Sequence, residues 1–80
     1  MPEIDFLVLD RFFAAGPGLT ADVLATANLA VSLAGHPAPF RWRVLTRDGG
    51  PVRSSSNMCL EAEGRWDEAS ADLQMVFGVG

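Results

Sequence analysis

The chain has 80 residues, of which 49% are hydrophobic and 20% are charged, and its formal net charge is −4. These values are typical of one small globular domain and argue against a disordered chain. An acidic chain with six arginines and no lysine does not attract nucleic-acid phosphates, so we expect no direct DNA binding by these residues. Its single cysteine, Cys59, excludes an internal disulfide and a multi-cysteine metal site, and it fits a reducing compartment.

The sequence carries no signal for export or for insertion into a membrane. Its first residues, MPEID, have no basic region ahead of an apolar run, which a secretory signal would need. Polar residues or glycines interrupt every apolar stretch well short of the roughly 20 residues that span a bilayer. We therefore expect a cytoplasmic protein without membrane contact.

The first predicted element is a short buried strand, IDFLVL, from Ile4 to Leu9. Asp10 and Arg11 end this strand. The residues that follow include Gly16-Pro17-Gly18, which is typical of a loop.

A helix is predicted from Leu19 to Gly35, where alanine and leucine dominate. Thr20 is the expected N-cap, and Gly35 is the expected stop because Pro37 and Pro39 prevent continuation. The apolar residues at helical spacing are Leu19, Val23, Leu24, Ala27, Ala30, Val31 and Ala34.

The stretch from Phe40 to Thr46 alternates aromatic or apolar residues with arginines, which predicts a strand of period two. Asp48-Gly49-Gly50-Pro51 predicts a tight turn. Residues 52–62 (VRSSSNMCLEA) then predict one or two short strands at a sheet edge, and residues 64–71 a connector with one helical turn. Asp72 to Gly80 predicts a final apolar strand. This order of elements argues for a parallel sheet covered by helices.

Three stretches, residues 6–29, 40–60 and 71–80, resemble the start of the DJ-1/PfpI-like (class I glutamine amidotransferase-like) domain. The subgroup they resemble most is the N-terminal sensor domain of AraC-type (GlxA-like) transcriptional regulators. The family pattern has a helix ending in Ala27-Asn28, an aromatic strand at Trp42 to Leu45, the segment DGGPVRSSS, and a closing ADLxxVxGG strand. Two residues depart from the pattern: Asn57 replaces a glycine that follows the serines, and Val79 separates the final glycines.

The resemblance implies an α/β fold, a partial flavodoxin-like three-layer sandwich with a mainly parallel sheet. Domains of this family are considerably longer than 80 residues. Residues 1–80 are therefore expected to be the N-terminal portion of one such domain, without its remainder and without a helix-turn-helix domain. The turn and serines at residues 48–57 are expected to shape the chain after the second strand of the sheet, a topological role.

The resemblance also implies a function: a non-catalytic sensor and dimerisation domain of an AraC-type regulator. Its expected partners are a small-molecule effector and further copies of the full-length protein, with DNA contacted only through an absent C-terminal domain. Two alternatives stay open. One is a fragment of a DJ-1/PfpI-type cysteine hydrolase or amidase, and the other is a truncated gene product without a function of its own.

DJ-1/PfpI enzymes carry a reactive cysteine on a strand-to-helix turn, assisted by an acid from the loop after the first strand. By this resemblance the cysteine position lies beyond Gly80, and Cys59 is expected to be a small buried apolar residue. The acid would fall near Gly16, which has no side chain and cannot act as an acid. Asp10 is a weak substitute for it. We therefore assign no catalytic residue, and the residues that bind a ligand stay unknown.

The remaining candidates have simpler interpretations. His36 is expected in an exposed loop, so the serines at 54–56 have no histidine at a triad spacing. Arg41 and Arg43 are expected on an outward or partner-facing side of their strand. We assign no metal and no cofactor, because the scattered acidic residues lack a histidine partner and are expected to face solvent. Those acidic residues are Glu61, Glu63, Asp67 and Glu68.

A sheet that lacks its remaining strands leaves an edge and a face uncovered. We therefore expect the isolated 80-residue chain to unfold in urea with a broad transition or to associate through this uncovered sheet. Fluorescence-monitored unfolding at several protein concentrations checks this. A sharp, monomeric and concentration-independent transition would contradict the half-domain interpretation.

Overall fold

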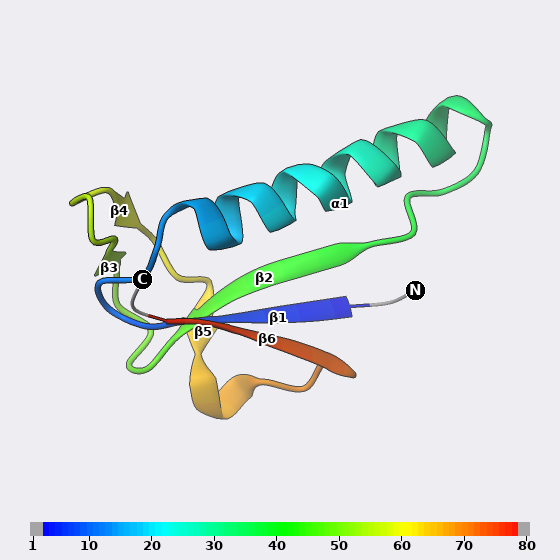
Figure 1. Cartoon of the computed structure of the whole chain (residues 1–80). Coiled ribbons are helices and arrows are strands. Elements are labelled where there is room, and N and C mark those ends of the chain that lie inside the picture. Colours follow the sequence, from blue (N-terminus) through cyan, green and yellow to red (C-terminus); the bar gives the residue numbers. More distant parts are fainter. Residues whose placement is uncertain (1–2, 79–80) are drawn as a thin grey trace.

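The computed structural model describes residues 3–78 as a four-stranded parallel sheet with one long α-helix on one face (Figure 1). The strand order is β5-β2-β1-β6, and a separate antiparallel pair, β3 and β4, lies beside the sheet. In the sheet, β1 pairs with β2 from Glu3↔Arg41 and with β6 from Ile4↔Leu73. The elements are β1 (Glu3–Val8), α1 (Ala15–Leu33), β2 (Arg41–Thr46), β3 (Val52–Arg53), β4 (Cys59–Leu60), β5 (Gly64–Arg65), the 3-10 turn η1 (Trp66–Glu68) and β6 (Leu73–Phe77). The predicted α/β class and mainly parallel sheet are confirmed.

The core lies between the sheet and α1. Alternate residues of a strand point to opposite faces, and Ile4, Phe6 and Val8 of β1 are all buried on the α1 side. The rings of Phe6 and Phe77 meet edge to face with their centroids 5.0 Å apart, which joins β1 to β6. Phe12, in the loop after β1, completes this buried cluster.

The start of the helix differs from the sequence prediction. Gly16-Pro17-Gly18 lies inside the first turn of α1 and does not form a loop. A proline is tolerated there because the N–H groups of a first turn have no partner within the helix. Thr20 is not the N-cap: its hydroxyl donates a hydrogen bond to the Gly16 carbonyl one turn earlier, 2.8 Å away. The residue at the N-cap is Ala14, which offers no side-chain cap.

The end of the helix agrees with the prediction. Gly35 follows the C-cap in the left-handed region, at φ +87°, and donates to the carbonyl of Ser32. Asn28 then ties α1 to the approach to β2. Its side-chain amide donates to the Phe40 carbonyl and accepts from the Phe40 N–H, both at 2.9 Å. This pair of bonds gives the Ala27-Asn28 motif a physical role.

The segment after β2 was predicted as a turn followed by one or two short strands, and the structure has the turn and two strands. Gly49 adopts a positive φ of 80°, and the Asp48 carboxylate accepts a hydrogen bond from the Gly50 N–H. The two strands, however, form the separate β3–β4 hairpin and not an edge of the main sheet. The edge position beside β2 belongs to β5, within what was predicted as a connector.

The two faces of the sheet are covered unequally (Figure 1). The helix α1 lies over one face, and the opposite face carries η1 and the chain that follows it. The final predicted strand extends beyond β6 to Val79 and Gly80, which lie outside the described residues.

The double hydrogen bond of Asn28 predicts a stability effect. Asn28→Ala leaves the Phe40 N–H and carbonyl without these partners, so we expect the free energy of unfolding to fall by about 1–3 kcal/mol. Urea midpoints followed by tryptophan fluorescence measure the change. Ser32→Ala, at an exposed position of the same helix, is the matched control and should shift the midpoint little. Equal shifts of the urea midpoint in the two variants would contradict the stabilising role given to Asn28.

Candidate functional site

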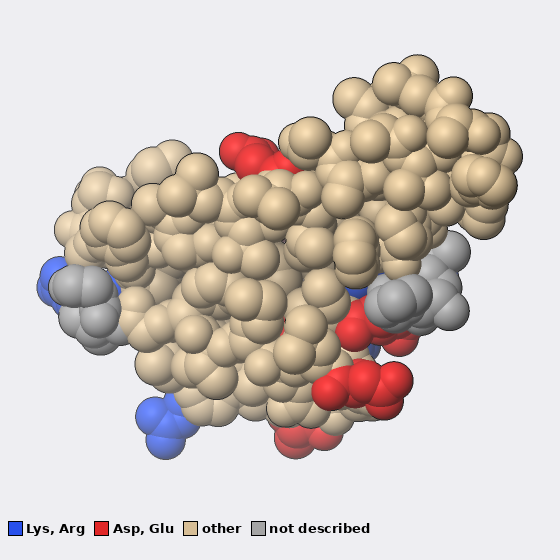
Figure 2. Space-filling view, turned by 45° about the vertical axis from the view of Figure 1, so that its right-hand side comes forward, with Lys and Arg blue, Asp and Glu red and all other residues tan. Residues whose placement is uncertain are grey.

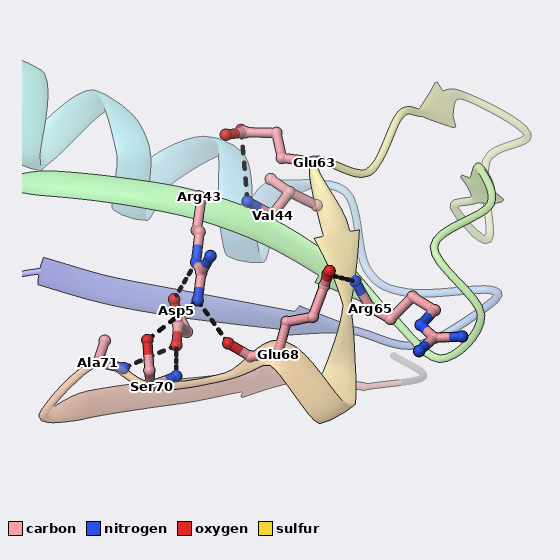
Figure 3. A network of polar contacts seen from close by, with 8 residues as sticks. All are labelled: Asp5, Arg43, Val44, Glu63, Arg65, Glu68, Ser70 and Ala71. Atoms are coloured by element: carbon pink, nitrogen blue, oxygen red, sulfur yellow. Dashed lines mark hydrogen bonds and ion pairs between the residues drawn. The ribbon is translucent and has the colours of Figure 1, made fainter.

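A buried carboxylate lies in the middle of the central strand, on the face opposite α1 (Figure 3). Asp5 has 1% of its surface exposed. One of its oxygens accepts a hydrogen bond from Nε of Arg43 on β2 at 2.8 Å. The other accepts from the backbone N–H groups of Ser70 and Ala71, at 2.8 and 2.9 Å. Arg43 also donates to the Glu68 carbonyl at 2.7 Å, so one network joins β1, β2 and the approach to β6.

The partners of Asp5 decide its charge state. Burial by itself raises the pKa of the Asp5 carboxyl. The hydrogen bonds from Arg43, Ala71 and Ser70, together with the positive charge of Arg43, outweigh burial and hold the pKa below its ordinary value of 3.8. The hydrogen bond with Asp5 in turn raises the pKa of Arg43. Asp5 is therefore ionised at neutral pH, and its three donors leave it poorly placed to act on a substrate. We assign it a structural role.

The carboxyl ends of β1, β2 and β6 gather at one end of the sheet, beside the β3–β4 hairpin (Figure 1). Ligands of open α/β sheets bind at such an edge, where neighbouring connections leave in opposite directions. Here the chain passes from β1 to β2, which pairs with one edge of β1, while β6 pairs with the other edge of β1. The edge beyond β1 is therefore the candidate site.

The loop after β1 is fixed to the serine turn at this edge. The Arg11 N–H donates to the Arg53 carbonyl at 2.6 Å, and the Ser55 N–H donates to the Phe12 carbonyl at 2.8 Å. The Asp10 carboxylate accepts a hydrogen bond from the Arg53 N–H at 3.2 Å. Arg11 itself adopts a positive φ of 62°, an uncommon conformation for a residue with a side chain. These hydrogen bonds thus join the loop after β1 to the serine turn.

Two cavities flank Asp10 at this edge. The first, which we call the strand-end cavity, has a volume of about 540 Å³ and lies over the ends of β1 and β2. Its polar lining residues are Asp10, Arg47, Asp48 and Trp66, and its apolar ones are Val8, Leu9, Pro51 and Val52. The second, the serine-turn cavity, has about 250 Å³ and is lined by Asp10, Arg11, Arg53, Ser54, Ser55 and Asn57. Both combine carboxylate and guanidinium groups, which suits a small polar ligand.

Trp66, which also lines the strand-end cavity, carries a buried polar atom. Its indole N–H is buried and has no hydrogen-bond acceptor among residues 3–78. A buried donor without an acceptor costs about 1–3 kcal/mol.

The serine turn has the topological role expected from the sequence. Ser54 is buried, and its hydroxyl accepts a hydrogen bond from the Met58 N–H at 3.0 Å. The hydroxyls of Ser54 and Ser56 lie 2.9 Å apart. Asn57 adopts a positive φ of 70°, as expected for a residue that replaces a glycine. These contacts close the tip of the β3–β4 hairpin.

The expectation for Cys59 was wrong, because its side chain is exposed on β4. A two-residue strand in a hairpin cannot bury both of its faces, so the small apolar residue turns outward. Cys59 lies on a strand of the hairpin and not on a strand-to-helix turn, although it lines an apolar cavity together with Ala14 and Pro17 at the start of α1. His36 is exposed just beyond the other end of α1, so a helix of 19 residues, about 28 Å long, separates the two.

Gly16 occupies the position where the resemblance places an acid. A Cβ atom there would lie 3.0 Å from the ring of Phe77, so any side chain would press on the core contact between α1 and β6. Asp10, the weak substitute, is exposed and binds the backbone of β3. Asp10 forms no hydrogen bond with Cys59 among those of residues 3–78.

The remaining residues take the places expected of them, with one addition. His36 and the acidic residues 61, 63, 67 and 68 are exposed, and Arg41 faces outward. Arg43, expected to face solvent or a partner, instead forms the ion pair with Asp5. Among residues 3–78, no three His, Cys, Asp or Glu side chains lie close enough to hold a metal ion, and no helix there is long and apolar enough to cross a membrane.

Sequence reasoning did not identify Asp5, Arg47 or Trp66 as site residues, and it treated Trp66 as a core candidate. A signal existed for Asp5: a lone acid inside an otherwise apolar strand needs a buried partner, and the outward arginines of the next strand could supply one. Arg47 and Trp66 become neighbours only through the β2–β5 pairing, which no sequence motif predicted.

The solved structures that resemble this chain include a transcriptional regulator and a DJ-1 superfamily protein. An AraC family transcriptional regulator from Pseudomonas putida is 30% identical, with a TM-score of 0.84 over 100% of this chain and 42% of its own length. A DJ-1 superfamily protein from Agrobacterium tumefaciens is 22% identical, with a TM-score of 0.71 over 99% of this chain and 38% of its own. The second likeness shows the fold alone. No protein-family model and no curated protein matches the sequence.

These likenesses confirm the resemblance expected from the sequence. The chain has a DJ-1/PfpI-like, flavodoxin-like fold, and along its whole length it is similar to part of an AraC family regulator. It spans less than half the length of either protein.

The Asp5 network predicts a pH dependence. Because the folded-state pKa of Asp5 lies below 3.8, its contribution to stability is fully present above the unfolded pKa and is lost as pH falls through the folded pKa. Asp5→Asn should lower the free energy of unfolding at pH 7 by about 1.5–3 kcal/mol, through weakened hydrogen bonds to a charged group. The gap between native and variant urea midpoints should narrow below about pH 4.

The matched control is Asp67→Asn. Asp67 pairs with Arg65 at the surface, with 66% of its side chain exposed, so its loss should change stability by less than about 0.5 kcal/mol. A gap between native protein and Asp5→Asn that stays constant from pH 7 to pH 3 would contradict the role given to Asp5.

Proposed function

We propose that this chain is part of the effector-sensing domain of an AraC-type transcriptional regulator, acting in the cytoplasm without catalysis. The observation that carries the proposal is the likeness along the full chain to the Pseudomonas putida regulator, with a TM-score of 0.84 and 30% identity. Residues 1–80 would then be the first portion of a larger DJ-1/PfpI-like domain. Contact with DNA would come from another domain, because this portion is acidic.

The effector would bind in the strand-end cavity. Arg47 and Asp48 offer charges of both signs at the end of β2, and Trp66 offers an indole face with a buried N–H that lacks an acceptor. Such a lining favours a small polar metabolite that carries a charge and at least one acceptor oxygen. The cavity also touches Asp10, and through it the loop after β1 and the serine turn.

Sensing would follow from a difference in affinity between two arrangements of this edge. A ligand shifts a conformational equilibrium only by as much as it prefers one state. The edge offers an element for such a shift, because the Asp10 loop and the β3–β4 hairpin are joined by few hydrogen bonds. A ligand in the strand-end cavity would favour the arrangement in which these bonds are closed.

The alternative is a cysteine hydrolase or amidase, and the exposure of Cys59 is the observation in its favour. Its surroundings argue against it. A cysteine hydrolase needs a base beside its nucleophile, and the single histidine of the chain, His36, lies beyond the opposite end of α1 from Cys59. The proposal therefore favours a sensor.

Thermal unfolding with a panel of amino acids, diamines and dicarboxylates tests the proposal. We expect at least one compound class to raise the melting temperature, since a ligand at 100 times its Kd adds about 2.7 kcal/mol to the free energy of unfolding. Arg47→Ala and Trp66→Phe should weaken that binding about tenfold or more. Arg41→Ala, at the opposite end of β2, is the matched control and should leave it unchanged.

Equal weakening by Arg41→Ala would place the ligand elsewhere. Turnover of an ester or amide substrate that disappears in Cys59→Ser would overturn the non-catalytic proposal and favour the hydrolase.

A further inference from the structure

The serine-turn cavity concentrates positive charge in a chain that is acidic overall. Two of the six arginines, Arg11 and Arg53, line it together with one acid, Asp10, which leaves a surplus of one positive charge. The whole chain has a formal net charge of −4. In Figure 2 the most visible arginine side chains lie at the left, toward the end that carries the β3–β4 hairpin in Figure 1, while most acidic ones lie toward the right and below. The local charge of this cavity therefore favours an anionic ligand.

The backbone holds the two arginines next to each other although they lie far apart in the sequence. The Arg11 N–H donates to the Arg53 carbonyl at 2.6 Å, and Phe12 forms a parallel bridge with Ser54. Arg11 takes this place with a positive φ of 62°, which is uncommon for a residue with a side chain. Like charges on neighbouring segments repel each other, and an anion between them would offset that repulsion.

No acid of residues 3–78 forms an ion pair with either arginine. The ion pairs of this part of the chain lie elsewhere, between β1 and β2 and between β5 and η1. Asp10 lines the same cavity, but its carboxylate accepts its hydrogen bond from the backbone N–H of Arg53 and not from a guanidinium. The positive charge of the cavity is therefore left for a ligand.

One of the two guanidinium groups is already held at the serine turn. The Nη1 atom of Arg53 donates to the Asn57 carbonyl at 3.2 Å. Within residues 3–78, the Nε and Nη2 atoms of Arg53 and the whole guanidinium of Arg11 donate to no protein group. Each arginine thus keeps N–H donors that a ligand can use.

We propose that the serine-turn cavity binds the carboxylate group of a small organic acid, held between Arg11 and Arg53. A guanidinium presents two parallel N–H donors that match the two oxygens of a carboxylate. The side chains of Ser55 and Asn57 belong to residues that line the same cavity, and both carry hydrogen-bond donors. The volume of about 250 Å³ lies below the roughly 300–1,000 Å³ typical of ligand pockets, so the acid is small.

The charge of the cavity selects a carboxylate over a phosphate. One carboxylate matches the surplus of one positive charge. A phosphate monoester carries about −1.5 to −2 at pH 7 and would leave negative charge beside Asp10. Because both arginines are exposed, water and salt compete for them, and we expect a dissociation constant on the order of millimolar.

A bound acid would contact the loop after β1 and the β3–β4 hairpin at once, and it would therefore stabilise their junction. The site does not depend on the effector site proposed above. The serine-turn cavity and the strand-end cavity share Asp10, but the arginines that line them differ.

An NMR titration of the 80-residue chain with sodium acetate tests the proposal, at an ionic strength held constant with sodium chloride. The amide signals of the residues that line the cavity should shift and saturate. Arg11→Gly should weaken acetate binding about fivefold or more, and its fold should be kept because glycine suits a positive φ. Arg53→Gln should act in the same direction. Arg41→Gln, exposed at the other end of the sheet, is the matched control and should leave acetate binding unchanged.

Arg11→Lys separates the forked contact from charge alone, because lysine keeps the charge and loses the two parallel donors. It should bind acetate more weakly than the native chain, and equal binding would contradict the forked contact. Shifts that rise without saturation, shifts that chloride reproduces, or tighter binding of inorganic phosphate than of acetate would each overturn the proposal. Loss of acetate binding in Arg47→Ala but not in Arg11→Gly would place the acid in the strand-end cavity. That result would overturn this inference and leave the proposed effector site standing.

Discussion

The sheet depends on one buried carboxylate. Asp5 lies in the central strand, and its two oxygens bind in opposite directions: one toward β2 through Arg43 and one toward the approach to β6 through Ser70 and Ala71. A carboxylate that leaves water must regain its solvation from such donors, or it destabilises the fold. Because Asp5 accepts hydrogen bonds from three such donors, it fixes where both neighbouring strands lie.

The registers of these strands follow from that constraint. Asp5 stands opposite Arg43 in β2 and opposite Gln74 in β6. A slip of one residue would turn the carboxylate toward α1, among Ile4, Phe6 and Val8 of the apolar core. The aligned strands bring their carboxyl ends to one edge, and the strand-end and serine-turn cavities form there. The Asp5 network, on the sheet face opposite α1, thus sets the position of the candidate site although none of its residues lines that site.

Much of this fold could be read from the sequence, because β1, α1, β2, β6 and the glycine turn each depend on local periodicity and turn chemistry. The start of α1 could not be read from the sequence, since a Gly-Pro-Gly run normally ends a helix. Here the run occupies the first turn, where N–H groups have no partner within the helix and a missing N–H therefore costs little. The exposure of Cys59 and the edge strand β5 depend on how distant segments pack. The candidate site was hidden for the same reason: Asp10, Arg47 and Trp66 are brought together by strand pairing.

The position of β1 between β2 and β6 also sets the order in which the protein can fold. Strand β1 is made well before β6 and must wait for it, since Ile4 pairs with Leu73. During synthesis, α1 and the β1–β2 pair can form while Asp5 still lacks the N–H groups of Ser70 and Ala71. Contacts between residues so far apart in sequence close slowly. The nascent chain therefore exposes an unpaired edge of β1 until almost all of these residues have left the ribosome, and at that stage it is most open to aggregation or chaperone binding.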